Sequence, residues 1–482
     1  MKKLLLLIFI FTNVLISQTP CENGFAGEYP CNDYDLLANI PISTLANTNG
    51  NPEGSDIWGW TDTTTGKEYA LVATTNSTAF VDVSDPINPV FLGRLDSNAG
   101  NNFWRDVKIY NNHAFIVADN VGAHGMQVFD LTKLRGVTSV QNFTADAIFT
   151  GVGSCHNIVI NESSAFAYLV GCNSFSGGPV FVDISDPKNP KAAGGYSAMG
   201  YTHDAQVITY NGPDVTHQGK ELFIGSNGNE FGTNEVVVVD VTDKSSPQLI
   251  SNTAYQNSRY AHQGWFTEDH KYFILGDELD ELGIGNNTKT IVFDMTDLDN
   301  PQVSSTYFGP TAAIDHNGYV KGNLYFMANY TAGVRILDIT NIVAATNSMT
   351  EVGYFDTYPS NNSTGFNGAW SVYPYFASGN IIISDIQRGL FIIRKSGTLN
   401  LNSISEKNNF LIFPNPTFSD VTISAGSNQK IQNIQLFSIL GKKVVEKQNI
   451  NQEKYVLETS QLSKGVYIAR INNNISKKII LR

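Results

Sequence analysis

The sequence predicts an all-β protein: a seven-bladed β-propeller over residues 18–397, followed by a small C-terminal β-sandwich over residues 410–482. Three observations predict this class: a strand-forming composition, a repeat of about 50 residues, and a change of composition after Gly397. Val, Ile, Thr, Tyr, Phe, Gly and Asn dominate, whereas helix-forming blocks are scarce. Hydrophobic residues make up 42% of the 482 residues, and aromatic residues 11%, which is enough to fill a packed interior.

One short pattern recurs along the chain: an aliphatic or aromatic run, Asp, an aliphatic residue, and Ser or Thr, often with Pro shortly after. Such a pattern is typical of a strand that runs into a turn capped by Asp, Ser or Thr, so we interpret the Asp as structural. A further copy, at residues 390–394, has lost the Asp. The repeated residues are Asp82, Asp130, Asp183, Asp240, Asp294 and Asp338.

A second repeated element precedes each of these copies, and we expect it to begin the first strand of each repeat. A spacing of about 50 residues with about four short strands per repeat indicates a propeller, here with seven blades. The first position of the element holds Ser55, Arg105, His156, His203, His262, His316 and Trp370. The next position holds Asp56, Asp106, Asn157, Asp204, Gln263, Asn317 and Ser371.

The N-terminal segment is expected to close the ring. Most repeats end in an outer strand such as residues 351–355, but the seventh stops after residues 394–396 without one. A matching segment, residues 36–40, lies before the first repeat. If this segment completes the last blade, the ring has no open sheet edge.

The ends of the chain carry export signals. Two Lys followed by the apolar run 4–11 predict a signal peptide over residues 1–17, because this run is too short to span a bilayer. The residues before Cys21 do not fit a lipid attachment site. Residues 398–409 have the composition of a linker. We expect a mature chain without a transmembrane segment, secreted or held at the outer cell surface after export through the periplasm.

Charge excludes two classes of partner. The formal net charge is −13, and Lys and Arg are concentrated in residues 406–482, so the rest of the chain is more acidic still. An acidic surface repels nucleic acids and anionic membranes. We therefore expect neither as a partner.

The four cysteines predict two disulfides, since their number is even in an exported chain. Cys155 and Cys172 lie symmetrically about the predicted turn 161–164, so they would face each other across a hairpin. Cys21 and Cys31 would then form the other bond.

The C-terminal segment resembles a known export module. Several of its phrases occur in order at the extreme C-terminus: 413–416 (Phe-Pro-Asn-Pro), 436–442, 462–467 and the basic end 477–482. Together they resemble the type A C-terminal sorting domain of the type IX secretion system of Bacteroidota. The resemblance implies that the segment routes the chain across the outer membrane, that the secretion machinery is a partner, and that the segment is removed during export or anchoring.

The body resembles the choice-of-anchor B family, whose propellers contain LVIVD-type repeats. The phrases that carry the resemblance are 262–270, 276–281, 315–322 and 329–335. The resemblance covers roughly residues 33–396. It implies a propeller fold, but it brings no defined reaction with it.

The repeat register brings candidate site residues to one rim of the central funnel. Four of the eight histidines occupy the same repeat position in consecutive repeats, so we select His156, His203, His262 and His316 as candidate ligands of one divalent metal ion. The alternative is that they are polar fasteners between blades. An acidic segment, 277–283, lacks the ligand pattern of an EF-hand, and we interpret it as a solvated loop instead of a calcium site. The candidate binding residues are Arg105, Asp106, Asp204, Asp277, Glu278, Asp315 and Trp370.

Two functions remain open at this point. The favoured hypothesis is a binding propeller for an extracellular polymer, glycan or protein. The alternative is a metal-assisted hydrolase or lyase acting in the funnel. No nucleophile motif, P-loop or Cys-x-x-Cys is present, and the sequence identifies no cofactor beyond the metal hypothesis. A purely structural surface protein is disfavoured by the histidine column.

We predict that export shortens the chain at both ends. Cleavage near Ser17 and Gln18 removes the signal peptide, and residues beyond about 405 are lost or modified. Mass spectrometry of the secreted protein measures both ends. An intact C-terminal peptide on surface-exposed protein would contradict the assignment of a sorting domain.

Overall fold

A computed structural model describes residues 18–47, 51–230, 232–343, 348–397, 410–417, 419–425, 430–438, 442–472 and 475–482. The predicted signal peptide and linker, 1–17 and 398–409, lie outside the described residues. The chain divides into two compact units, Met1–Thr398 and Leu399–Arg482. Within the described ranges, no helix is long and apolar enough to cross a bilayer.

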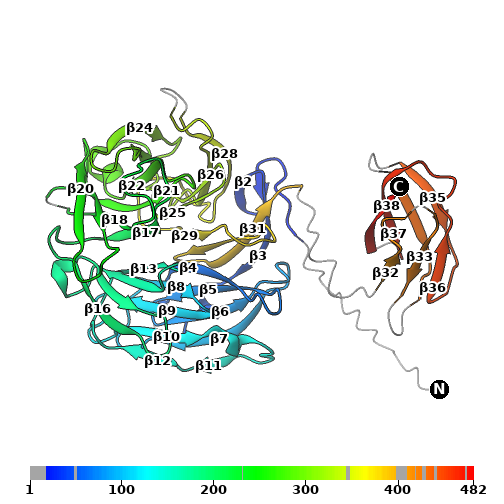
Figure 1. The fold of residues 1–482 in the computed structure, drawn as a ribbon, viewed down its shortest axis with the longest axis horizontal. Coiled ribbons are helices and arrows are strands. Elements are labelled where there is room, and N and C mark those ends of the chain that lie inside the picture. Colours follow the sequence, from blue (N-terminus) through cyan, green and yellow to red (C-terminus); the bar gives the residue numbers. More distant parts are fainter. Residues whose placement is uncertain are drawn as a thin grey trace, which may run out of the picture. The chain divides into compact units, whose positions relative to one another are not determined.

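Both units are built from strands, which confirms the all-β class. In the part of unit 1 that the structure describes, the strands form seven sheets, each centred on an antiparallel meander (Figure 1). The first four sheets consist of β4 (Gly54–Thr61), β5 (Glu68–Thr74), β6 (Ser77–Asp82), β7 (Val90–Asp96) and β11 (Gln141–Phe143); β8 (Arg105–Tyr110), β9 (His113–Ala118), β10 (Met126–Asp130) and β12 (Ala147–Phe149); β13 (Asn157–Asn161), β14 (Phe166–Val170), β15 (Val180–Asp183) and β16 (Lys191–Gly195); and β17 (Asp204–Thr209), β18 (Glu221–Asn227), β19 (Glu235–Asp240) and β20 (Gln248–Ala254).

The remaining three sheets of unit 1 include the N-terminal strands, and four short helical segments lie between strands. The sheets consist of β21 (Ala261–Phe266), β22 (Tyr272–Asp277), β23 (Lys289–Asp294) and β24 (Gln302–Phe308); β25 (Gly318–Lys321), β26 (Leu324–Ala328), β27 (Val334–Asp338), β28 (Thr350–Phe355), β2 (Tyr29–Asn32) and β1 (Phe25–Ala26); and β29 (Ala369–Tyr373), β30 (Ile381–Asp385), β31 (Gly389–Lys395) and β3 (Tyr34–Ile40). The helical segments are α1 (Ile42–Leu45), the 3₁₀ turns η1 (Leu131–Leu134) and η2 (Phe175–Gly177), and α2 (Asp280–Ile284).

The first strands of the seven sheets form a closed ring. Each of β4, β8, β13, β17, β21, β25 and β29 contacts the next in chain order, and β29 contacts β4. The expected closure by the N-terminal segment is confirmed, because β3 pairs antiparallel with β31, the last strand of the unit. One pairing was not anticipated: β11 pairs parallel with β7 of the preceding sheet, and β12 takes the fourth place in the β8–β10 sheet.

The repeated Asp has the structural role that the sequence predicted. In each of six copies its Oδ1 accepts a hydrogen bond from the backbone N–H two residues later, which caps the turn after the third strand. The N···O distances lie between 2.8 and 3.0 Å. The acceptors are Asp82, Asp130, Asp183, Asp240, Asp294 and Asp338.

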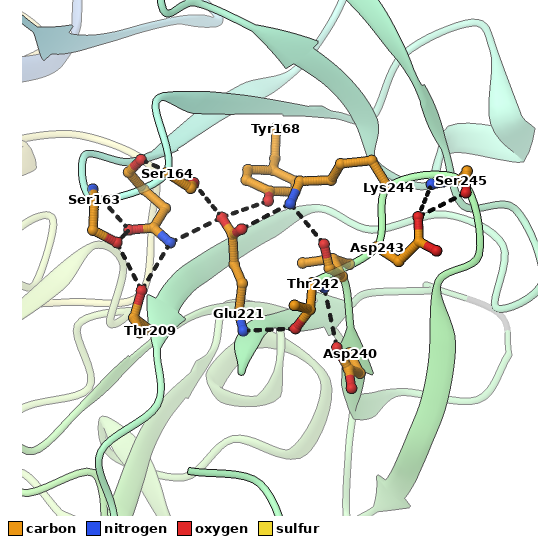
Figure 2. Close-up of polar contacts among 12 residues, drawn as sticks. Ser163, Ser164, Tyr168, Thr209, Glu221, Asp240, Thr242, Asp243, Lys244 and Ser245 are labelled. Atoms are coloured by element: carbon orange, nitrogen blue, oxygen red, sulfur yellow. Dashed lines mark hydrogen bonds and ion pairs between the residues drawn. The ribbon is translucent and has the colours of Figure 1, made fainter. Parts of the chain in front are cut away.

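A buried carboxylate fastens two neighbouring sheets to each other. Glu221 of β18 accepts hydrogen bonds from Tyr168 Oη of β14 at 2.7 Å and from Ser164 Oγ at 2.5 Å, and Lys244 Nζ lies 2.7 Å from its other oxygen (Figure 2). Although burial opposes ionisation, these hydrogen bonds hold the pKa of Glu221 below its ordinary value. The charge is therefore retained where two sheets meet.

Both predicted disulfides are confirmed. Cys155 and Cys172 continue the β13–β14 register, in which Asn157 faces Val170, and their Cα atoms lie 4.0 Å apart. The Cys21–Cys31 bond joins Cα atoms 6.0 Å apart. It ties the segment before β1 to strand β2.

The interpretation of segment 277–283 as a solvated loop is wrong. Asp280 and Glu281, which begin α2, are buried, and Lys289 Nζ lies 2.6 Å from Asp280 Oδ2. Glu281 accepts a hydrogen bond from the backbone of Lys289 at 2.9 Å. The short helix folds these acidic side chains inward against β23, an outcome that local polarity does not reveal.

A buried polar layer lies where the first strands converge. Lys108 Nζ of β8 lies 2.9 Å from Asp56 Oδ2 of β4 and 2.5 Å from Asp106 Oδ1. Asn317 donates to the second oxygen of Asp56 at 3.4 Å. Burial opposes the charge on Asp56, yet Lys108 holds its pKa below the ordinary value. Burial raises the pKa of Asp106 well above its ordinary value and that of Asp204 to about 7.

Unit 2 contains two sheets whose apolar residues share one core. Val421 and Leu457 come from one sheet, and Leu436 and Ile471 from the other, and all four are buried together. The sheets consist of β32 (Leu411–Phe413), β33 (Val421–Ser424) and β36 (Lys454–Leu457), and of β35 (Lys443–Lys447), β34 (Ile434–Ser438), β37 (Gly465–Ile471) and β38 (Ile475–Leu481).

Replacing Lys108 by Met should destabilise the fold by about 3–5 kcal/mol at neutral pH, because it removes the cation from buried carboxylates. The deficit should shrink as pH falls from 8 to 5. Without Lys108 the pKa of Asp56 rises above its unfolded value, and the stability lost at high pH returns as the carboxyl takes up a proton. Thermal melting at both pH values measures the effect.

Lys133→Met provides the control, since Lys133 makes an exposed ion pair with Asp146. An equal deficit for the Lys108 and Lys133 variants, or a Lys108 deficit that grows on acidification, would contradict the assignment.

Candidate functional site

A cavity of about 440 Å³ lies on the axis of unit 1. Its lining residues come mainly from the starts of the first strands and from the loops beside them. They are Glu53, Phe103, Trp104, Asp119, His156, Tyr201, His203, Glu230, Tyr260, His262, Glu278, Leu279, His316, Tyr330, Phe366, Trp370 and Ile386.

The four histidines of the repeat column form a continuous arc in this cavity. Each lies at or just before the start of a first strand, so the ring of strands brings the rings side by side. Trp370 of β29 extends the arc. Adjacent ring centroids lie 4.3 Å apart for His156 and His203, 4.2 Å for His203 and His262, 4.2 Å for His262 and His316, and 4.6 Å for His316 and Trp370.

Hydrogen bonds at Nδ1 orient three of these rings. Nδ1 of His203 lies 3.1 Å from the carbonyl oxygen of His262, and Nδ1 of His316 lies 2.6 Å from the carbonyl oxygen of Trp370. Nδ1 of His156 lies 3.0 Å from Asp119 Oδ2. A carbonyl oxygen only accepts, so Nδ1 of His203 and His316 carries the proton, and Nε2 of the neutral ring keeps a lone pair.

Burial keeps the deeper histidines neutral. Burial, together with the neighbouring imidazoles, lowers the pKa of His203 and of His262 well below the ordinary value. Burial lowers the pKa of His316 to about 3. These three side chains therefore offer nitrogen lone pairs instead of positive charge at physiological pH.

Glu278 places a carboxylate against the arc. It follows β22 directly, and its Oε2 and Oε1 lie 3.7 Å from Nε2 of His262 and of His316, respectively. Tyr330 Oη donates to Oε1 at 2.8 Å. Burial raises the pKa of Glu278 to about 7. One ligand atom from each of Glu278, His262 and His316 lies within 4.8 Å of the others, so these residues form a candidate metal-binding group.

Several predicted binding residues lie elsewhere. Asp106 and Asp204 belong to the polar layer around Lys108 and do not line the cavity. Arg105 is buried, and its guanidinium donates to Ser97 Oγ at 2.7 Å and to the Asn102 carbonyl at 2.9 Å, which fastens a loop.

Two further predicted residues also hold local structure. Asp277 accepts hydrogen bonds from the backbone N–H groups of Arg259 and Tyr260, each at 2.7 Å. Asp315 accepts from Thr290 Oγ1 at 2.9 Å. The cavity therefore brings together the four histidines, Glu278 and Trp370, but not the other five candidates.

Sequence reasoning included Trp370 but missed the tyrosines of the cavity wall and the central cation. Tyr201 and Tyr260 each stand two residues before a column histidine, so a repeated Tyr-x-His spacing was available as a signal. No other repeat has a lysine at the position equivalent to Lys108, so the comparison of the repeats did not single this residue out. Lys108 lines a second cavity of about 180 Å³ with Trp58 and Trp265, and this cavity shares no lining residue with the first.

Two family models match parts of the chain. The model described as a secretion system C-terminal sorting domain matches residues 411–482. The LVIVD repeat model matches residues 66–97 and 222–254. No curated protein matches the chain.

Solved structures resemble the chain at low sequence identity. PorZ of Porphyromonas gingivalis, described as a bacterial surface component of the type IX secretion system, is 12% identical with a TM-score of 0.44, over 86% of this chain and 58% of that one. The chain thus spans little more than half of PorZ. A functionally unknown protein from Desulfotomaculum acetoxidans is 11% identical with a TM-score of 0.44, over 64% and 87%. The periplasmic gluconolactonase PpgL of Pseudomonas aeruginosa is 12% identical with a TM-score of 0.41, over 71% and 98%.

The matched segments fix the destination of the protein. A sorting domain at the C-terminus directs export to the cell surface or the medium, and the LVIVD repeats fall within the sheets of unit 1. The chain therefore carries LVIVD repeats within the sheets of unit 1 and a type IX secretion C-terminal sorting domain over residues 411–482.

Proposed function

We propose that the protein is a surface-displayed binding module, a seven-bladed propeller that holds an extracellular ligand in its central funnel. The observation that carries this proposal is the 440 Å³ cavity, on which side chains from successive sheets converge. The seven sheets and the closed ring of their first strands support the blade count. We infer that the two sheets of unit 2 form a sandwich that engages the secretion machinery.

The rim of the cavity has side chains suited to contact with a ligand. Tyr201 and Phe366 line the cavity. They are 37% and 47% exposed, respectively, although both carry large aromatic rings. Trp104 lies deeper, 6.2 Å from the ring of His156 between centroids. Aromatic faces stack on sugar rings and attract cations.

Charge narrows the class of ligand. Glu53, Asp119 and Glu230 line the cavity together with Glu278, and its described lining includes no Lys or Arg. A negative potential disfavours anionic ligands. The proposed ligand is therefore a neutral or cationic segment of a glycan or a protein.

The second candidate is a metal-assisted hydrolase or lyase. One observation favours it, the grouping of His262, Glu278 and His316 at the cavity. A metal ion there would have to retain a coordination position open to the cavity. This candidate therefore depends on metal binding, whereas the binding function does not.

We expect the mature protein to bind neutral oligosaccharides or polyamines, and not oligogalacturonate of matched length. Tryptophan fluorescence reports binding, since Trp104 and Trp370 line the cavity. Phe366→Ala should weaken binding up to about tenfold, the scale of one lost aromatic contact.

Phe308→Ala is the matched control, because Phe308 is 58% exposed on the outer strand β24 and does not line the cavity. Preferential binding of oligogalacturonate, equal weakening by both substitutions, or no binding of any probe at millimolar concentration would each contradict the proposal.

A further inference from the structure

We propose that His262, His316 and Glu278 bind one divalent transition metal ion of the zinc class. The inference deepens the proposed function and rests on the same cavity, where the ion would present a coordination site to the ligand. Of the four histidines that the sequence suggested as metal ligands, this proposal retains two, His262 and His316. It also adds a carboxylate that the repeat column does not contain.

Distances within the group suit a small ion. Each Nε2 lies 3.7 Å from a different oxygen of Glu278. In a tetrahedral zinc site, bonds of about 2.0–2.1 Å place neighbouring ligand atoms about 3.3 Å apart. The three ligand atoms, which lie within 4.8 Å of one another, would have to approach to about this separation to close around an ion.

Both histidines face Glu278 at 3.7 Å, beyond hydrogen-bond distance. Nδ1 of His316 donates to the Trp370 carbonyl, so its Nε2 presents a lone pair toward Glu278 Oε1, 3.7 Å away. The His262 ring is 2% exposed, and its Nδ1 has no hydrogen-bond partner among the described residues. Two imidazoles and a carboxyl group that direct one ligand atom each into a space less than 4.8 Å across have the arrangement of a cation site.

Neighbouring residues support the ligands in the manner of metal sites. In metal sites, a carbonyl oxygen that accepts from the non-ligating nitrogen of a histidine fixes the tautomer and the ring plane. The carbonyl oxygen of Trp370 accepts from Nδ1 of His316 in this way. Tyr330 Oη holds one oxygen of Glu278 at 2.8 Å. His203 packs its ring 4.2 Å from that of His262 between centroids. We assign these contacts a positioning role.

The ligand set favours a borderline metal over a hard one. Imidazole nitrogens suit Zn²⁺, Ni²⁺ and Co²⁺, whereas Ca²⁺ and Mg²⁺ prefer oxygen ligands throughout. Three protein ligands leave at least one position for water or a ligand atom. Such a position would face the cavity that the aromatic residues surround.

A second group of similar composition is satisfied without an ion. His217 Nε2 lies 3.1 Å from Asp299 Oδ2, while Lys220 Nζ lies 3.3 Å from Nδ1. The ammonium group donates to Nδ1, so Nε2 carries the proton and donates to Asp299. Both nitrogens are thus occupied, and His217 provides a matched control.

Zinc titration of the chelator-treated full-length protein tests the inference. Isothermal titration and elemental analysis should give one Zn²⁺ per chain for the unmodified protein and for His217→Ala. Glu278→Gln, which is nearly isosteric, and His316→Ala should weaken binding at least 100-fold with unchanged circular dichroism. Retained stoichiometry in both site variants, equal loss in His217→Ala, or no zinc binding by the unmodified protein would overturn the inference.

X-ray absorption at the zinc edge provides a readout that needs no variant. We expect scattering from two imidazole ligands, and a spectrum without imidazole would overturn the assignment even if a variant fails to fold. The outcomes separate the two proposals. Oligosaccharide or polyamine binding without zinc binding removes only the metal site, whereas zinc binding without either probe removes only the organic ligand.

Discussion

The pairing of β3 with β31 is the constraint on which the rest of unit 1 depends. It joins the N-terminal strand to the last strand of the ring, so the sheet edge that would otherwise remain open is paired. The first strands can then contact one another in an unbroken circle from β4 to β29 and back. Because the circle closes, equivalent positions of every repeat must meet on one axis.

That convergence creates both the polar layer and the cavity. Where the first strands converge, the polar layer pairs Lys108 with Asp56 and Asp106. One position earlier in the repeat, five of the seven copies carry a ring, and the four imidazoles lie side by side with their planes tilted against one another. The cavity shares no lining residue with the smaller one, to which the polar layer contributes Lys108.

The site combines periodic and non-periodic contributions. The histidines come from the repeat, and their register explains why they form an arc. Glu278 and Tyr330 come from loops between strands, where the chain is free to differ from repeat to repeat. Their hydrogen bond, and the 3.7 Å approach of Glu278 to two imidazoles, distinguish one side of an otherwise repetitive ring. The arrangement of polar groups in the cavity therefore depends on the irregular part of the fold.

The sequence by itself determined the all-β class, the closing strand, the Asp-capped turns, both disulfides and the export tag, because each follows from local pattern or from repeat register. It also predicted which histidines share a rim. Tertiary structure alone decided that Glu278 faces His262 and His316, that Lys108 pairs with Asp56, and that Asp277 and Arg105 fasten loops. Packing between sheets determines where a side chain from a non-repeating loop points. The repeat pattern of the sequence therefore cannot predict this direction.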